Sequence, residues 1–177
     1  QDRVIVTATK SGFENNYARL GDYLSRTISD PTADLDKDGQ VSLLESFILA
    51  SSQVEEFYRQ NGRLATEHAL IDDNGDSLGT PANWFRGVIG QQKAQGANQL
   101  DGLQANQFHL IRSPEEKKLT AEMRKQRNDL ERQLTALREK KGAIDTGEYF
   151  KRLERICLEL AQIYQQVEQQ GKGNEPR

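Results

Sequence analysis

A segment that begins at Asp34 and ends at Glu45 restricts the fold of this chain more than any other stretch. It reads Asp-Leu-Asp-Lys-Asp-Gly-Gln-Val-Ser-Leu-Leu-Glu, so side-chain oxygens stand at positions 1, 3, 5, 9 and 12 and a glycine at position 6. In an EF-hand loop, alternate residues turn inward around a hard cation, and the glycine takes the positive φ that bends the backbone. The spacing therefore predicts a calcium loop whose last residue lies in the first turn of a helix.

The predicted ligands of this loop combine carboxylates with a hydroxyl and a backbone carbonyl. They are Asp34, Asp36, Asp38, the carbonyl of Gln40, Ser42 and Glu45. Glu45 is expected to bind Ca2+ through both of its carboxylate oxygens. The alternative is an acidic loop that caps a helix without binding a metal.

Two features distinguish this segment from a standard EF-hand. Ser46 follows the loop where the exiting helix usually carries a large apolar residue, and Pro31 interrupts the helix that would enter it. We therefore expect calcium here to be structural and to fix the junction between two helices, in contrast to a sensor protein in which calcium opens them.

A second acidic segment, residues 72–83, matches the same pattern less well. Its candidate ligands at positions 1, 3 and 5 are Asp72, Asn74 and Asp76. Ser77 replaces the position-6 glycine and Asn83 offers one neutral oxygen at position 12, so this loop acting alone would bind calcium weakly. The alternative is a metal-free turn built on Asn-Gly and Gly-Thr-Pro. If both loops bind, we expect Val41 and Leu78 to pair them back to back.

The hydrophobic pattern predicts a mainly α fold with a small α/β part. Residues 3–9, RVIVTAT, are nearly continuously apolar, which is typical of a central strand covered on both faces. Apolar residues recur at helical spacing over residues 17–29 and 42–60, so the calcium loop lies between two helices. Residues 107–112 predict a second strand. This α/β and EF-hand-like region is expected to cover residues 1–112.

Residues 113–170 predict an antiparallel, coiled-coil-like helical hairpin. Ser113-Pro-Glu-Glu116 has the capping-box pattern, in which Glu116 reaches back to the Ser113 N–H. Apolar residues then follow helical spacing to about Lys140 and again over residues 149–167, with a short connection that forces the two helices antiparallel. We expect residues 171–177 to form a disordered tail.

Charge and hydropathy exclude two classes of partner. The net charge is −3, with 24 basic and 27 acidic residues, and no clustered positive field indicates nucleic-acid binding. Residues 1–112 carry 10 basic and 15 acidic side chains, whereas residues 113–177 carry 14 and 12, so the two halves differ in sign. The apolar runs are far shorter than the roughly 20 residues of a membrane span. A start at Gln1 without a signal-peptide pattern indicates a processed chain or a portion of a longer one.

The positions of the two histidines and of the single cysteine do not indicate a catalytic site. His68 and His109 are far apart and lie in apolar neighbourhoods. Cys157, the only cysteine, stands on the apolar stripe of the last predicted helix, which favours inert packing at the seam of the hairpin. We expect all three residues to be structural.

Residues 3–60 resemble the C-terminal half of bacterial caspase-like or legumain-like domains. The resemblance depends on RVIVTAT, the following Lys-Ser-Gly and the segment Ala-Asp-Leu-Asp-Lys-Asp-Gly-Gln-Val-Ser-Leu-Leu-Glu before a helix. It extends to residues 62–76 and to bacterial proteins that combine this calcium loop with a helical C-terminal part. It implies a doubly wound sheet. The catalytic Cys and His of that family lie upstream of the matched strand, so neither is carried over to this chain.

Two hypotheses for function remain open. In the first, the chain is a non-catalytic calcium-binding module whose hairpin recognises a partner or associates with itself, presenting an apolar stripe of Tyr149, Phe150 and Ile163. The hairpin could equally pack on the preceding region. In the second, the chain is part of a caspase-like hydrolase or pseudoenzyme with its catalytic residues upstream. Calcium sites of moderate affinity favour an extracytoplasmic location, where calcium is abundant.

Overall fold

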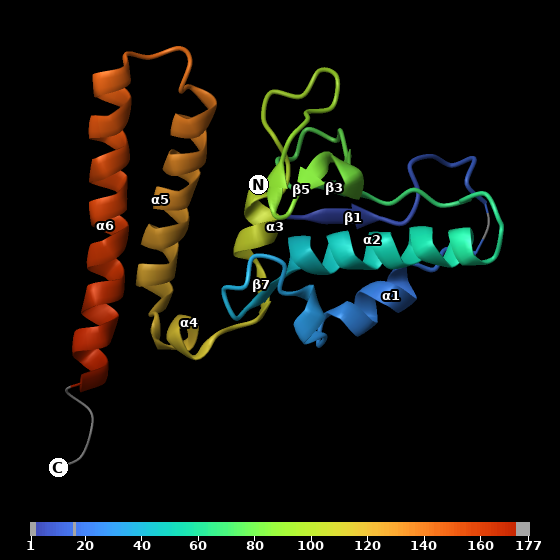
Figure 1. The fold of residues 1–177 in the computed structure, drawn as a ribbon, viewed down its shortest axis with the longest axis horizontal. Coiled ribbons are helices and arrows are strands. Elements are labelled where there is room, and N and C mark those ends of the chain that lie inside the picture. The colour runs from blue at the N-terminus through green and yellow to red at the C-terminus, as the bar shows by residue number, and fades with distance from the viewer. Residues whose placement is uncertain (1–2, 16, 173–177) are drawn as a thin grey trace. The chain divides into compact units, whose positions relative to one another are not determined.

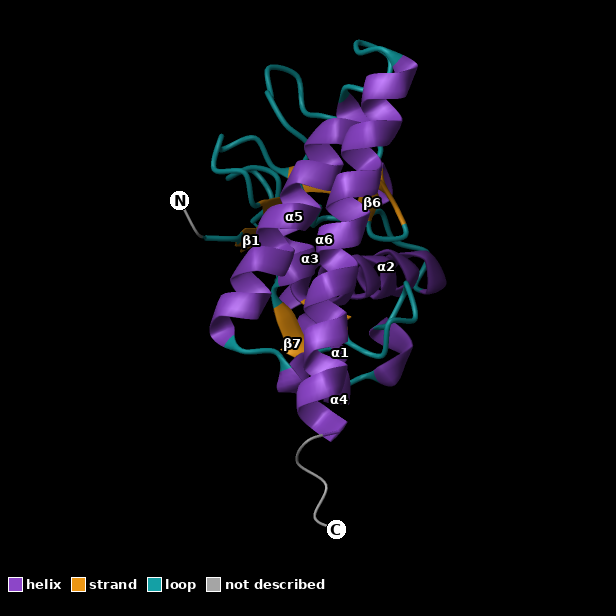
Figure 2. Ribbon diagram, turned by 90° about the vertical axis from the view of Figure 1, so that its left-hand side faces the viewer, coloured by secondary structure: helices purple, strands orange, loops and turns teal. Residues whose placement is uncertain are grey.

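The computed structural model describes residues 3–15 and 17–172, and these residues are mainly helical with a few short antiparallel strands (Figures 1 and 2). The chain consists of two compact units, Gln1–Arg112 and Ser113–Arg177, which we call the N-terminal and the C-terminal unit. Within the described residues, no helix is both long enough and apolar enough to cross a membrane.

Two packed helices, α1 (Leu20–Thr27) and α2 (Leu43–Gln60), dominate the N-terminal unit (Figure 1). The helix predicted over residues 42–60 is present as α2, and α1 is shorter than its predicted range. Ser42 caps α2 because its hydroxyl accepts the Glu45 N–H, and Glu45 in turn accepts the Ser42 N–H, which completes a capping box. The short 3-10 helix η1 (Pro31–Ala33) and the first acidic loop, residues 34–45, connect α1 to α2.

The principal sheet of the N-terminal unit has three antiparallel strands in the order β1-β3-β4. They are β1 (Ile5–Thr7), β3 (Leu70–Asp72) and β4 (Thr80–Pro81), with Val6 opposite Ile71 and Ile71 opposite Thr80. The strand predicted at residues 3–9 is therefore present, but its predicted central position is wrong. The central strand is β3, which sequence reasoning missed because it has only three residues and the last of them, Asp72, is already the first residue of the second acidic segment.

Two smaller pairings complete the strands of this unit. The second predicted strand is β7 (His109–Ile111), and it pairs with β2 (Val41–Ser42). Val41 thus lies opposite Ile111, and the back-to-back pairing of Val41 with Leu78 that we expected is not formed. A separate hairpin joins β5 (Phe85–Arg86) to β6 (Ile89–Gly90).

The apolar residues of α2 contribute to two core clusters of the N-terminal unit. On one side they pack with α1, and the buried members of that cluster are Leu20, Ala50, Val54 and Tyr58. On the other side they pack with β3 and with α3 (Leu103–Gln107), and the buried members are Leu44, Phe47, Ile71 and Ala105, all fully buried. Because Leu44 and Phe47 flank Glu45, the end of the first acidic loop is anchored in this core.

The C-terminal unit contains α4 (Pro114–Lys118), α5 (Ala121–Glu139) and α6 (Thr146–Lys172). A single helix was predicted from Ser113 to about Lys140, but the chain is extended at Leu119 and starts again at Thr120, whose hydroxyl accepts the Met123 N–H at 3.2 Å. The Ser113 hydroxyl accepts the Glu116 N–H at 3.1 Å, as the capping pattern predicts, and the Glu116 carboxylate is bound by the Arg127 guanidinium. The buried arginine therefore determines the orientation of this glutamate.

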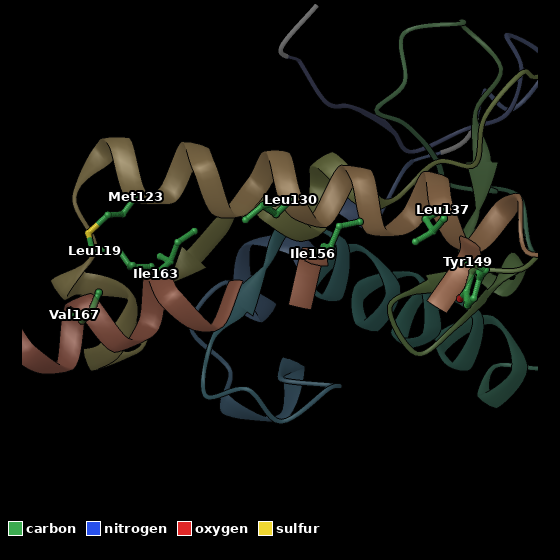
Figure 3. Close-up of a cluster of buried hydrophobic side chains, with 8 residues drawn as sticks. All are labelled: Leu119, Met123, Leu130, Leu137, Tyr149, Ile156, Ile163 and Val167. Carbon is green, nitrogen blue, oxygen red and sulfur yellow. The ribbon is translucent and has the colours of Figure 1, made fainter. Parts of the chain in front are cut away.

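Helices α5 and α6 run side by side in opposite directions and share one apolar cluster (Figures 1 and 3). Its buried members are Leu119, Met123, Leu130, Leu137, Tyr149, Ile156, Ile163 and Val167. Tyr149 and Ile163 are consequently not part of an exposed stripe, although Phe150 is 55% exposed. Cys157 is exposed, so the prediction that it lies at the seam is wrong; its neighbour Ile156 takes the inward position. Helix α6 continues to Lys172, and the rest of the predicted tail lies outside the described residues.

Candidate metal centre

The three aspartates of the first acidic loop converge, because one carboxylate oxygen from each lies within 4.8 Å of the others. The backbone that brings them together has positive φ at Lys37 (60°) and Gly39 (78°), which are positions 4 and 6 of the loop. The converging residues are Asp34, Asp36 and Asp38. Oxygen donors at alternate positions of a tight loop form the kind of cluster that hard cations prefer.

Backbone N–H groups orient the carboxylates of the first acidic loop. Asp34 accepts the N–H of Asp38 on Oδ1 at 3.1 Å and the N–H of Gly39 on Oδ2 at 3.1 Å. Asp38 accepts the Gln40 N–H at 2.8 Å and the Gln40 side-chain amide at 2.9 Å. Gln40, predicted as a ligand through its carbonyl, thus also steadies Asp38 through its two N–H donors.

Glu45 closes the first acidic loop from its far end. Its side chain is buried at 2% exposure, and Oε1 accepts the N–H of Leu35 at 2.8 Å and that of Asp36 at 3.4 Å. Oε2 accepts both the N–H and the hydroxyl of Ser42, each at 2.8 Å. The carboxylate at position 12 therefore contacts positions 2, 3 and 9 of the same loop and joins its two ends.

The clustering of negative charge is reflected in the titration of Asp36. Burial raises the pKa of this carboxyl above its ordinary value, and the nearby Asp38, Glu45 and Asp34 carboxylates raise it further. Among the described residues, none of these four carboxylates forms an ion pair with a basic side chain. A bound cation would offset this mutual repulsion.

The second acidic loop, residues 72–83, adopts the same local conformation. Positive φ again occurs at positions 4 and 6, which here are Gly75 (79°) and Ser77 (65°). Asp72 accepts the Gly75 N–H on Oδ1 at 2.9 Å and the Ser77 N–H on Oδ2 at 3.0 Å. Ser77 thus takes the backbone conformation that the sequence pattern assigns to glycine, so its presence does not alter the path of the loop.

The other two predicted ligands of the second acidic loop each accept the backbone N–H group that lies two residues further along the chain. Asn74 Oδ1 accepts the Asp76 N–H at 2.9 Å, and Asp76 Oδ1 accepts the Leu78 N–H at 2.8 Å. Asp76 Oδ2 is buried and has no hydrogen-bond partner. Asn83, at position 12, is exposed in the 3-10 helix η2 (Ala82–Trp84), so the loop receives no contribution from its own sequence at the position that Glu45 occupies in the first.

A residue that sequence reasoning missed, Asp101, lies against the second acidic loop. It is 5% exposed, and its carboxylate accepts the Asp73 N–H at 3.1 Å and the Thr80 hydroxyl at 2.6 Å. Burial raises the pKa of Asp101 to about 6, although the hydrogen bond from Thr80 opposes this shift. The EF-hand pattern covers only the twelve residues of the loop, so it does not include Asp101. The segment that leads to Asp101 is rich in Gln, Gly and Ala and gave no other signal.

His68, predicted to be structural in an apolar environment, has a polar partner. The His68 ring nitrogen Nδ1 lies 2.5 Å from Glu14 Oε1, and the His68 backbone N–H donates to Glu14 Oε2 at 3.2 Å. Glu14 also accepts the Lys10 N–H at 3.0 Å. The pair therefore connects the segment after β1 to the segment before β3, away from both acidic loops in sequence.

Both acidic loops offer only oxygen donors to a metal. Carboxylate, amide, hydroxyl and carbonyl oxygens suit hard cations such as calcium or magnesium, whereas Zn2+ and softer metals prefer sites that include Cys or His. Calcium accepts six to eight oxygens in flexible geometry, which agrees with ligands spread over a loop. The chain matches no protein-family model, no curated protein and no solved structure.

Proposed function

We propose that this chain is a calcium-binding, non-catalytic structural module with an EF-hand-like loop at residues 34–45. The observation that carries the proposal is the position of Glu45, a buried carboxylate that is folded onto the loop whose three aspartates converge. Asp34, Asp36, Asp38 and Glu45 would hold the ion together with Ser42 and the carbonyl of Gln40. Calcium would neutralise the cluster and join the two ends of the loop.

A structural role is favoured over a sensor role because both flanks of the loop are anchored in the core. Ala33, just before the loop, is fully buried, as are Leu44 and Phe47 on either side of Glu45. A calcium-driven rotation of α2 would expose these side chains to water, at a cost of about 1.5–3 kcal/mol for each large apolar residue. Calcium binding is therefore expected to stabilise the existing packing.

The second acidic loop is proposed as an additional site of the same chemistry, with Asp72, Asn74 and Asp76 as ligands. The support is that both loops have positive φ at positions 4 and 6, and that the side chains at positions 1, 3 and 5 accept the N–H groups of positions 6, 5 and 7 in both. Two ions would then bind the N-terminal unit.

The antiparallel helical hairpin formed by α5 and α6 is proposed as an arm for a protein partner or for self-association. Helix α6 carries exposed apolar side chains, namely Phe150 (55%) and Leu158 (57%). The resemblance to caspase-like domains and the extracytoplasmic location both stay predictions. In the alternative of a caspase-like hydrolase or pseudoenzyme, the catalytic residues would lie upstream of this chain.

Calorimetric titration of the chelator-treated chain with Ca2+, and separately with Mg2+, tests the proposal. We expect one or two calcium ions per chain and a rise in melting temperature, since a ligand at 100 times its Kd stabilises the folded state by about 2.7 kcal/mol. Glu45→Gln should abolish binding at the first loop. Glu55→Gln is the matched control, because Glu55 is exposed on the same helix and its replacement removes the same charge. Absence of heat and of stabilisation with both metals would refute calcium binding.

A further inference from the structure

We propose that Asp101 is the missing position-12 ligand of the second acidic loop, so that this loop is a complete calcium site closed by a residue from a separate segment of the chain. The inference rests on the proposed function, since it assigns a ligand to the second of the two calcium sites. It is argued from the contacts of Asp101, which repeat those of Glu45 in the first loop.

Glu45 provides the reference geometry. Its Oε1 accepts the backbone N–H groups of loop positions 2 and 3, Leu35 at 2.8 Å and Asp36 at 3.4 Å. Its Oε2 accepts the hydroxyl of loop position 9, Ser42, at 2.8 Å. One oxygen therefore faces the start of the loop and the other faces its ninth residue.

Asp101 makes the equivalent contacts in the second acidic loop. Its Oδ1 accepts the N–H groups of positions 2 and 3, Asp73 at 3.1 Å and Asn74 at 3.4 Å. Its Oδ2 accepts the hydroxyl of position 9, Thr80, at 2.6 Å. The same three loop positions are contacted, with the same division between the two oxygens, although Asp101 lies outside the loop in sequence.

A reciprocal interaction fixes Asp101 in this position. The Asp73 carboxylate accepts the Gly102 N–H at 2.9 Å and the Ala105 N–H at 2.8 Å, and so holds the start of α3 against the loop. Gly102 has φ of 109°, and a Cβ there would lie 2.5 Å from Phe85 Cε1. Because the start of α3 lies close to the second loop, the aspartate side chain of Asp101 is long enough to make the contacts that the longer Glu45 makes in the first loop.

The electrostatics of the second acidic loop independently indicate a cation. Asp76 Oδ2 is a buried carboxylate oxygen without a hydrogen-bond partner. Asp72, Asp73 and Asp101 are buried at 7%, 5% and 5% exposure. In the described part of the chain none of these four carboxylates pairs with a Lys, Arg or His side chain. Buried carboxylates are normally paired with a cation or coordinate a metal, and the hydroxyl and N–H donors here leave the negative charge uncompensated.

The test is calcium titration of the full chain as wild type and as three variants. Asp101→Asn should reduce the stoichiometry from two ions to one, and Asn83→Ala should leave it at two, because Asn83 is exposed and offers no ligand. Asp22→Asn is the charge-matched control, since Asp22 is exposed on α1. Two ions with unchanged Kd in the Asp101→Asn variant would overturn the proposal, as would loss of an ion in the Asn83→Ala variant.

The outcomes separate this proposal from the proposed function. A wild-type chain that binds one ion, which Glu45→Gln removes and Asp101→Asn leaves unchanged, would overturn the role of Asp101 and retain the calcium module. A wild-type chain that binds no calcium would overturn both.

Should Asp101→Asn fail to fold, the wild-type chain itself decides the question. The 13C resonance of the Asp101 carboxyl, followed by NMR during calcium titration, should shift in step with that of Asp76. A carboxyl resonance that does not respond would overturn the assignment.

Discussion

The ion pair between Glu116 and Arg127 in the C-terminal unit permits a quantitative prediction. The guanidinium binds the carboxylate through two parallel contacts, at 2.9 and 3.2 Å, and the residues are 3% and 4% exposed. Burial disfavours the charge on Arg127, but the carboxylates of Glu131 and Glu116 and the nearby Tyr164 outweigh it and raise the pKa of Arg127. The charge of Arg127 is therefore stabilised by the carboxylates that contact it.

Replacing Arg127 leaves the Glu116 carboxylate buried without its cation, whereas Arg127 has a second ion pair, with Glu131 at 3.7 Å. For a buried pair this costs about 3–5 kcal/mol of the free energy of unfolding, and Arg127→Met is expected to show a loss of this size. In a unit of this size, about 1 kcal/mol lowers the melting temperature by roughly 4–8 °C, so the unit should melt at least about 12 °C lower. The double variant Glu116→Met/Arg127→Met should recover most of the loss, because similar-sized apolar residues remove both charges.

The assay is thermal unfolding of the full chain by circular dichroism, with hydrogen exchange of the α5 amides to assign the change to the C-terminal unit. Arg132→Met is the control, because Arg132 forms an exposed pair with Asp129 whose loss should cost no more than about 1 kcal/mol. If Arg127→Met behaves like Arg132→Met, or if the double variant is less stable than the single one, the pair does not have the energetic role described above.

Three further predictions concern the N-terminal unit. Glu45→Gln should lower calcium affinity more than Asp76→Asn in calorimetric titration, because it removes half of a bidentate ligand; equal losses would contradict this ranking. Truncation after Arg112 should leave calcium binding intact, and aggregation of the truncated chain would show that the C-terminal unit covers the core. Burial would raise the pKa of Glu14, but hydrogen bonds from His68 and the Lys10 N–H lower it below 4.5. The stabilisation by Glu14 is therefore present above that pH and lost as the pH falls further. Melting temperatures measured across pH 3–6 should show this loss for the wild-type chain and not for a Glu14→Gln variant.

Local sequence determined the elements and the ligands whose partners lie a few residues away. The spacing of the aspartates from Asp34 to Asp38 predicted residues whose carboxylates converge, because a tight loop makes sequence neighbours into spatial neighbours. The capping box at Ser42 and the periodicity of α2 are local in the same sense. Helical periodicity also predicted the apolar cluster between α5 and α6, apart from the break at Leu119.

Tertiary structure decided every contact between residues far apart in the chain. No pattern in the sequence brings Asp101 to the second acidic loop, since its position depends on how Asp73 and the close packing at Gly102 hold α3. The same holds for the Glu116 carboxylate: the local pattern predicts the cap of Ser113 on the Glu116 N–H, whereas the buried ion pair with Arg127 depends on the packing of α4 against α5. Sequence spacing thus determines the local conformation of a segment and the side chains it brings together. Burial and long-range hydrogen bonds determine which side chain from elsewhere in the chain contacts that segment.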